Sequence, residues 1–228
     1  MTDIFKKVYH ISSFLWYAFI IQCIYAKGEK DLPPGLFVYG GPWKYLTFLN
    51  PVLQMVFFGL GSLNDLQPVG KDSKKSSLSL CKDLLFSVFV FPVGVFVVLL
   101  FWLIYTYDRN LVYPASMDTI FPSWLNHAMH TGVLPILLGE ILLEPHYYPK
   151  TKHGLSALGV IGLGYLGWVI WVYQTVGVWV YPILGMFSSA GLAVFFFLNM
   201  LVVSLLYFLG QTLNRKVWGR DHPGINRT

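Results

Sequence analysis

Charged residues are scarce in this chain of 228 residues, at 12% of the total, whereas a soluble domain carries about twice that share. No Lys, Arg, Asp or Glu occurs between Gly154 and Asn214. Intrinsic disorder is excluded because 55% of the residues are hydrophobic and 18% are aromatic. Two cysteines are too few for a disulfide framework or a Cys-rich zinc site. These absences leave the integral membrane class.

Long apolar runs take the place of the missing charge. A helix needs about 20 apolar residues to cross the ~30 Å hydrocarbon core of a bilayer. Uninterrupted stretches such as Phe91 to Tyr105 lack the alternation of a transmembrane β-strand. The sequence therefore predicts one all-α integral membrane domain over residues 1–228, a bundle of about six transmembrane helices. The expected spans are 8–26, 45–63, 84–107, 124–143, 155–176 and 186–209.

The basic residues are unevenly divided between the two sides of this predicted bundle. Lys27, Lys30, Lys44 and Arg109 fall on one side, and the other twelve of the sixteen Lys and Arg fall on the side of the N-terminus. Cytoplasmic loops hold the excess of Lys and Arg, so we expect both termini to be cytoplasmic. We expect the cell membrane, with the endoplasmic reticulum as the alternative. The net charge of +5 is then a topology signal, and we expect no nucleic-acid partner.

Three polar side chains share one face of the second span. At ~100° per residue, Thr47, Asn50 and Gln54 form a stripe in an otherwise apolar segment. Hydrogen bonding between helices explains such a stripe as readily as function does. Pro51 adds a further feature, because it has no N–H to donate to the carbonyl of Thr47. We therefore expect the helix to begin or kink beside Thr47.

The fourth span contains two histidines, His127 and His130, with Asn126 four residues before the second. Three interpretations compete: a metal-ligand pair, structural histidines with hydrogen-bond partners, and a general base for a nearby hydroxyl. A metal site needs more ligands than this pair supplies, so we expect no metal and no cofactor here. The remaining histidines are expected near membrane edges or in cytoplasmic segments: His10, His146, His153 and His222.

Thr47 and His130 both fall in the outer half of the predicted bilayer, so their side chains could meet. A threonine hydroxyl needs a base to act as a nucleophile, and imidazole is the usual one. The sequence has no Gly-x-Ser-x-Gly motif, which disfavours a conventional serine hydrolase. Glu140 is the only clear intramembrane carboxylate, and no repeated halves are visible, which disfavours a channel or transporter.

Several strings in the sequence resemble the androgen-induced family of multipass membrane proteins. The most specific is Trp-Leu-Asn-His-Ala-Met-His-Thr at residues 124–131, and the resemblance extends from about Tyr9 to Trp218. The other matching strings are 43–49, 91–96, 107–109 and 179–182.

This resemblance implies a six-helix membrane hydrolase of fatty acid esters of hydroxy fatty acids, with Thr47 as nucleophile and His130 as its histidine. Its implied partners are the membrane and this lipid substrate. Asn50, Asn126 and His127 match family positions, and their expected part is to orient the base or to donate to an oxyanion. Two alternatives stay open, a non-enzymatic membrane or signalling protein and an intramembrane acyltransferase. Lys44 and Arg109, near the outer interface, are weak candidates for binding a substrate carboxylate.

Overall fold

The computed structural model describes residues 2–26, 39–67, 76–119 and 121–219, and within them every regular element is a helix. Among these described residues, five helical segments are long and apolar enough to cross a membrane. The protein is therefore an all-α membrane protein, as the sequence predicts. The five segments are α1 (Thr2–Tyr25), α2 (Leu46–Leu66), the continuous α3 (Ser77–Leu85), η3 (Phe86–Val90) and α4 (Phe91–Asp108), α7 (Thr151–Val176) and α8 (Ser189–Trp218).

The expected fourth span is not one helix but two, α5 (Ser123–His130) and α6 (Val133–Leu143). The backbone N–H groups of Thr131 and Gly132 both bond the carbonyl of His127, which closes α5. Pro135 stands in the first turn of α6, where its missing N–H has no intrahelical partner to serve. Gly132 and Pro135 therefore favour a break, and an apolar count alone does not detect it.

Proline also shapes α2 and the third of the five membrane segments. α2 begins at Leu46 and continues through Pro51 as a regular helix, so the expected start of the helix near Thr47 is observed. In the third segment, η3 is a π-helix, and the N–H of Phe91 bonds the carbonyl of Phe86 five residues back. Pro92 cannot bond the carbonyl of Val88, and the wider π turn before it removes that mismatch.

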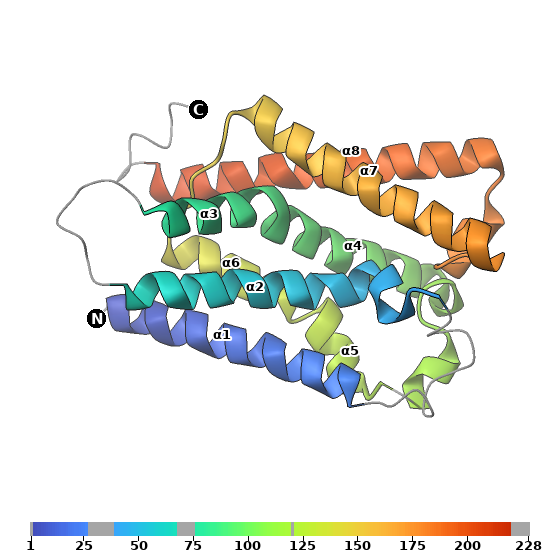
Figure 1. Ribbon diagram of the computed structural model, residues 1–228, viewed down its shortest axis with the longest axis horizontal. Coiled ribbons are helices and arrows are strands. Elements are labelled where there is room, and N and C mark those ends of the chain that lie inside the picture. Colours follow the sequence, from blue (N-terminus) through green and yellow to red (C-terminus); the bar gives the residue numbers. More distant parts are fainter. Residues whose placement is uncertain (1, 27–38, 68–75, 120, 220–228) are drawn as a thin grey trace.

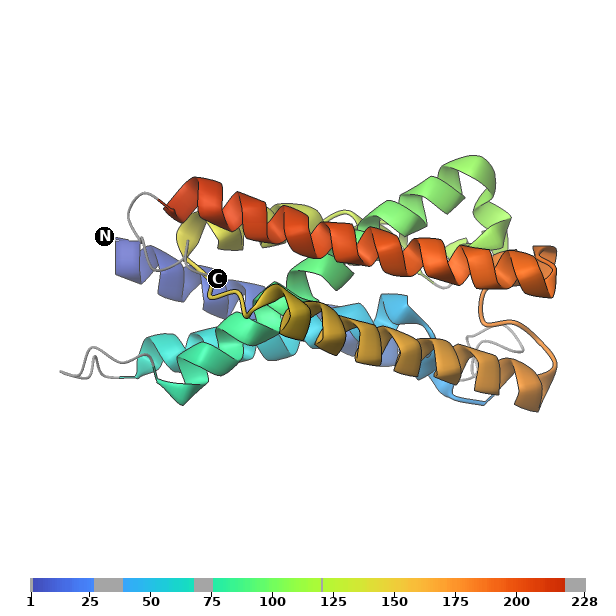
Figure 2. The ribbon, with the colours of Figure 1, turned by 90° about the horizontal axis from the view of Figure 1, so that it is seen from above.

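The helices run along the long axis of the molecule, and α1 packs along α2 (Figure 1). Seen from above, the segment from α3 to α4, in green, runs obliquely to α7 and α8 (Figure 2). Aromatic side chains fill the core between α1, α2 and α4, led by Tyr17, Phe57, Phe58, Phe86 and Phe91, each at most 1% exposed.

The faces of α7 and α8 that point away from this core are apolar and exposed. Val160 and Leu163 on α7 are 68% and 62% exposed, and Phe197 on α8 is 69% exposed. Exposed apolar area of this extent needs a lipid environment. It is the expected outer surface of a membrane protein.

Four short helices gather near the start of α2: η2 (Gly41–Lys44), η4 (Arg109–Leu111), η5 (Ala115–Thr119) and η6 (Pro182–Met186). Gly40 precedes η2 at φ +84°, and a Cβ there would lie 2.9 Å from the Trp168 ring. Glycine is required at this position on both grounds. It brings Lys44 and the start of α2 against α7.

The start of α1 and the end of α8 lie at one end of the molecule (Figure 1). An even number of crossings has this property, and the cytoplasmic placement of both termini stays a prediction. Seven of the basic residues used for it lie outside the described residues: Lys27, Lys30, Lys71, Lys74, Lys75, Arg220 and Arg227.

Candidate active site

The structure brings Thr47 and His130 together from helices 83 positions apart in the chain. Nε2 of His130 lies 3.4 Å from Oγ1 of Thr47. Thr47 is half-buried in the first turn of α2, and His130 is 1% exposed at the last residue of α5. Hydrogen bonds between a catalytic hydroxyl and its base are commonly long before substrate binds. The pair has the geometry of a nucleophile and its base.

The other ring nitrogen of His130 defines the tautomer. Nδ1 lies 3.0 Å from the backbone carbonyl of Asn126 and 2.8 Å from the side-chain Oδ1 of the same residue. A backbone carbonyl can only accept a hydrogen bond, so Nδ1 carries the proton. The unprotonated Nε2 therefore faces the hydroxyl of Thr47, which is the arrangement that a general base needs.

Aromatic groups hold the His130 ring and its backbone in place. The ring stacks on Phe101 with centroids 3.5 Å apart and planes 11° apart. Nε1–H of Trp102 donates to the His130 carbonyl at 3.1 Å. Stacking on Phe101 fixes one face of the imidazole, and the hydrogen bond from Trp102 fixes the backbone that carries it. Both contacts oppose rotation of the ring away from Thr47.

His127, Asn50 and Arg109 are not assembled around Thr47. His127 is exposed, bonds Thr131 through Nδ1 at 3.0 Å and stacks on Trp102. Asn50 is fully buried one turn below Thr47 and accepts from Nε2 of Gln54 at 3.1 Å. Arg109 forms a two-oxygen salt bridge with Asp118 at 2.8 Å.

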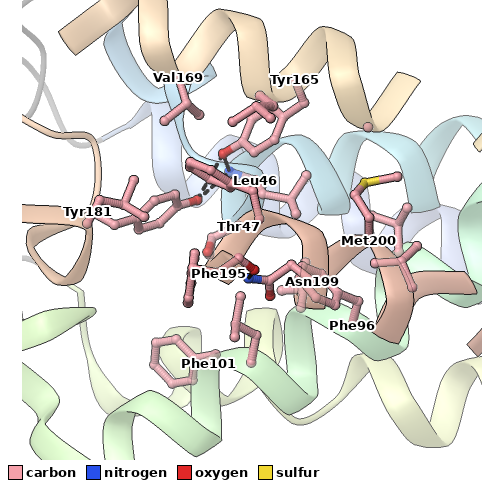
Figure 3. A pocket seen from close by; sticks show the side chains of 18 of the residues that line it. Leu46, Thr47, Phe96, Phe101, Tyr165, Val169, Tyr181, Phe195, Asn199 and Met200 are labelled. Atoms are coloured by element: carbon pink, nitrogen blue, oxygen red, sulfur yellow. Dashed lines mark hydrogen bonds between the residues drawn. The ribbon is translucent and has the colours of Figure 1, made fainter. Parts of the chain in front are cut away.

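Two cavities meet at Thr47. The first, of about 190 Å³, is almost entirely apolar and lies between α4, α7 and α8 (Figure 3). The second, of about 430 Å³, extends toward η2 and the segment before α5 and includes His130 and Lys44. Their common lining consists of Thr47, Phe101, Val112 and Tyr181.

Lys44 is the cationic residue that lines the second cavity, and it is 6% exposed. Its Nζ lies 5.4 Å from the centre of the Tyr45 ring. Burial lowers the pKa of Lys44, because the charged ammonium is partly removed from water. Lys44 and Thr47 line the same cavity, whereas Arg109 is paired with Asp118. Of the two cations considered for a substrate carboxylate, Lys44 is thus the one near Thr47.

Tyr165 and Tyr181 also belong to the site, although the sequence gives neither a role and only Tyr181 falls in a matching string, 179–182. Both phenol oxygens accept from the backbone N–H of Leu46, at 3.0 and 2.8 Å, and they lie 3.1 Å from each other (Figure 3). Tyr165 donates its own proton to the carbonyl of Lys44 at 3.0 Å. Burial raises the pKa of Tyr181, so its phenol stays protonated. The Tyr181 proton is thus available to Tyr165 or to the cavity.

A family model described as FAR-17a/AIG1-like protein matches residues 5–215 of this chain. The chain belongs to this family. The resemblance read from residues 124–131 and the other strings is thereby confirmed at the level of the family.

Curated relatives match along nearly the whole chain. The human androgen-dependent TFPI-regulating protein is 40% identical over 220 residues, covering 96% of each chain. The mouse protein of the same name is 40% identical over 221 residues, again covering 96% of each. The human androgen-induced gene 1 protein is 40% identical over 206 residues, covering 87% of this chain and 85% of its own. No solved structure matches the chain significantly.

Proposed function

We propose that the protein is an intramembrane esterase that hydrolyses fatty acid esters of hydroxy fatty acids, with Thr47 as nucleophile and His130 as base. The observation that carries this proposal is the 3.4 Å approach of His130 Nε2 to Thr47 Oγ1 at the junction of two cavities. The direction of the Nδ1 proton toward Asn126 supports it, because only an unprotonated Nε2 can accept the threonine proton.

The reaction proceeds in two balanced steps. His130 Nε2 takes the proton as Thr47 Oγ1 attacks the ester carbonyl, and the imidazolium returns it to the leaving alkoxide, which departs as the alcohol. His130 then takes a proton from water, the resulting hydroxide attacks the acyl-threonine, and the threonine oxygen leaves with the proton. The products are a free fatty acid and a hydroxy fatty acid, and the enzyme is restored.

Tyr181 supplies the donor that the oxyanion of each step needs. It lines both cavities beside Thr47, and its hydroxyl already accepts from Leu46 N–H at 2.8 Å. A phenol that accepts in this way is oriented while its own proton can turn toward the developing negative charge. Loss of one oxyanion donor typically costs about 10²–10³-fold in kcat.

The two cavities fit an ester that carries two hydrocarbon arms. Together they fall within the ~300–1,000 Å³ of small-molecule sites. The acyl arm occupies the apolar cavity between α4, α7 and α8. The hydroxy acid occupies the second cavity, where Lys44 is part of the lining and can bind the free carboxylate.

The test uses purified wild type, Thr47→Val, His130→Gln and the double variant, with Thr106→Val as the matched control. Thr106 is an exposed threonine on α4 that bonds its own helix at 2.8 Å. We expect each single variant and the double variant to fall to the same residual hydrolysis, about 10²–10⁴-fold below wild type, because the two groups act as a unit. A fluorophosphonate probe should label wild type and Thr106→Val but not Thr47→Val.

Three outcomes contradict the proposal. Near-normal turnover by folded Thr47→Val would mean that Thr47 is not the nucleophile. Absence of Thr47-dependent labelling favours a non-enzymatic membrane protein. Acyl transfer to an added alcohol in preference to water favours an acyltransferase.

Tyr181→Phe should lower kcat by about 10²-fold with little change in probe binding, and an unchanged kcat removes its role as oxyanion donor.

A further inference from the structure

A second polar centre lies at the other end of the bundle, where α1, α2, α3 and α6 meet at the left of Figure 1. Asp65 in this centre is eighteen positions after Thr47 on α2, which is ~27 Å at 1.5 Å per residue. The centre is therefore separate from the candidate active site. Its charged and imidazole residues are Lys6, His10, Asp65, Lys82, Asp83, Glu140, Glu144 and His146.

Two fully buried histidines in this centre converge on one carboxylate. Nε2 of His10 lies 3.0 Å from Oε2 of Glu140, and Nε2 of His146 lies 3.2 Å from Oε1 of Glu140. On the far side of each ring, Nδ1 of His10 is 2.6 Å from Asp65 and Nδ1 of His146 is 3.2 Å from Asp83. Carboxylates only accept hydrogen bonds, so each ring nitrogen must present a proton or bind a metal.

The His146 Nε2 atom distinguishes itself within this arrangement. It is buried and lies 3.2 Å from Oε1 of Glu140 in an ion pair that is not directed as a hydrogen bond. Buried polar atoms normally make well-directed hydrogen bonds. An imidazole nitrogen and a carboxylate oxygen at this separation also have the spacing of two ligands of one cation.

Buried charge in this centre favours a bound proton or cation. Among the described residues, the carboxylates of Asp65, Glu140 and Glu144 face the ammonium groups of Lys6 and Lys82. With neutral imidazoles these five groups carry one more negative than positive charge, and burial of unbalanced charge is strongly unfavourable. A proton on a histidine would balance that charge, and a metal cation bound in place of the proton would do the same.

We propose that this centre binds one divalent transition-metal ion of the zinc class, with His10 Nε2 and the carboxylates of Glu140 and Glu144 as ligands. These three residues offer ligand atoms that all lie within 4.8 Å of one another. Two ligands each ~2.0–2.2 Å from one ion stand about 3–3.5 Å apart, and the 3.0 Å between His10 and Glu140 agrees with this.

The surroundings of these ligands match those of metal sites in proteins. Asp65 accepts from Nδ1 of His10, which is the carboxylate–histidine–metal arrangement that fixes the ring and raises its basicity. Lys82 Nζ is 2.6 Å from Oε2 of Glu144, and Lys6 Nζ is 3.7 Å from Oε1, so Oε1 has the more distant ammonium group and is the oxygen that would bind the ion. His146 bonds Asp83 through Nδ1, and its Nε2, 3.2 Å from Glu140, is placed to supply a fourth ligand. A mixed imidazole and carboxylate set suits zinc and its neighbours rather than calcium or magnesium.

The experiment measures metal content in the full chain, purified in detergent without a histidine tag and without chelators. Wild type, His10→Gln, Glu140→Gln and the control His153→Gln are analysed by plasma mass spectrometry. His153 is an exposed histidine on α7, outside the centre. We expect about one metal ion per chain in wild type and in His153→Gln, and at least a tenfold lower content in the other two.

A second measurement keeps the inference testable if the variants do not fold. Wild type is stripped with a chelator, and its thermal midpoint is compared before stripping, after it and after zinc is restored. We expect the midpoint to fall on stripping and to recover with zinc but not with magnesium. Folded wild type with under a tenth of an ion per chain, or a midpoint indifferent to chelator and zinc, overturns the inference and assigns the balancing proton to a histidine of the centre. Equal metal in all four proteins also overturns it.

Discussion

Asn126 offers the sharpest test of how His130 is held. Its side-chain Oδ1 is 2.8 Å from His130 Nδ1, but its backbone carbonyl, at 3.0 Å, accepts from the same nitrogen. Asn126→Ala removes only the first of these two acceptors. A side-chain hydrogen bond contributes about 0.5–1.5 kcal/mol, which corresponds to about a 2–13-fold fall in kcat. The tautomer is preserved by the backbone, so the loss should be far smaller than that of Thr47→Val.

The assay is steady-state hydrolysis of a fatty acid ester of a hydroxy fatty acid, with Asn110→Ala as the control. Asn110 is exposed after α4 and should leave kcat and KM unchanged. In Asn126→Ala we expect kcat to fall and KM to stay the same, because Asn126 does not line either cavity. A folded Asn126→Ala that is as inactive as Thr47→Val refutes the idea that the backbone carbonyl alone preserves the tautomer of His130. An unchanged kcat refutes any part for the side chain.

Three further predictions address the carboxylate, the packing and the topology. Lys44→Met should raise KM at least several-fold for esters with a free carboxylate and not for their methyl esters, whereas Arg109→Met, paired with Asp118, should change neither; equal effects of the two variants contradict the assignment. Gly94→Ala should destabilise the protein by about 1–3 kcal/mol in thermal unfolding, because its Cβ would lie 2.7 Å from both Gln54 and Leu137, while Gly159→Ala, with nothing within 4 Å, should be neutral or stabilising. Lys150→Cys should resist impermeant thiol reagents added outside intact cells, and its labelling there would invert the predicted orientation.

Most of the fold follows from one property of the sequence, its long uncharged runs. Five of the six expected spans correspond to helices of membrane-crossing length. The fourth differs because Gly132 and Pro135 act on backbone hydrogen bonds, which an apolar count does not register. Helix ends also extend beyond the runs, as α8 does to Trp218, because basic residues in the last turn continue a helix past the hydrocarbon.

The candidate site is only partly accessible to such reasoning. Thr47 and His130 share a depth in the predicted bilayer, and Asn126 stands four residues before His130, so local periodicity suggests these three. Tyr165 and Tyr181 bond Leu46 across 119 and 135 positions, and no spacing rule covers such a separation. His10 meets Glu140 across 130 positions. The apolar runs place His10 and His146 near membrane edges or in cytoplasmic segments, and this placement does not predict their convergence on one carboxylate.

The break between α5 and α6 separates the two polar centres. His130 ends α5 and Glu140 lies within α6, ten positions further, or ~15 Å along a helix. With a break at Thr131 and Gly132, α5 can direct His130 at Thr47 while α6 independently directs Glu140 at His10. Distant sites without shared partners have additive effects within about 0.5 kcal/mol. The destabilisation of the double variant Thr47→Val with Glu140→Gln should therefore equal the sum of the two single values in chemical denaturation. A coupling above about 1 kcal/mol would mean that α5 and α6 act as one rigid unit and that the two centres are linked.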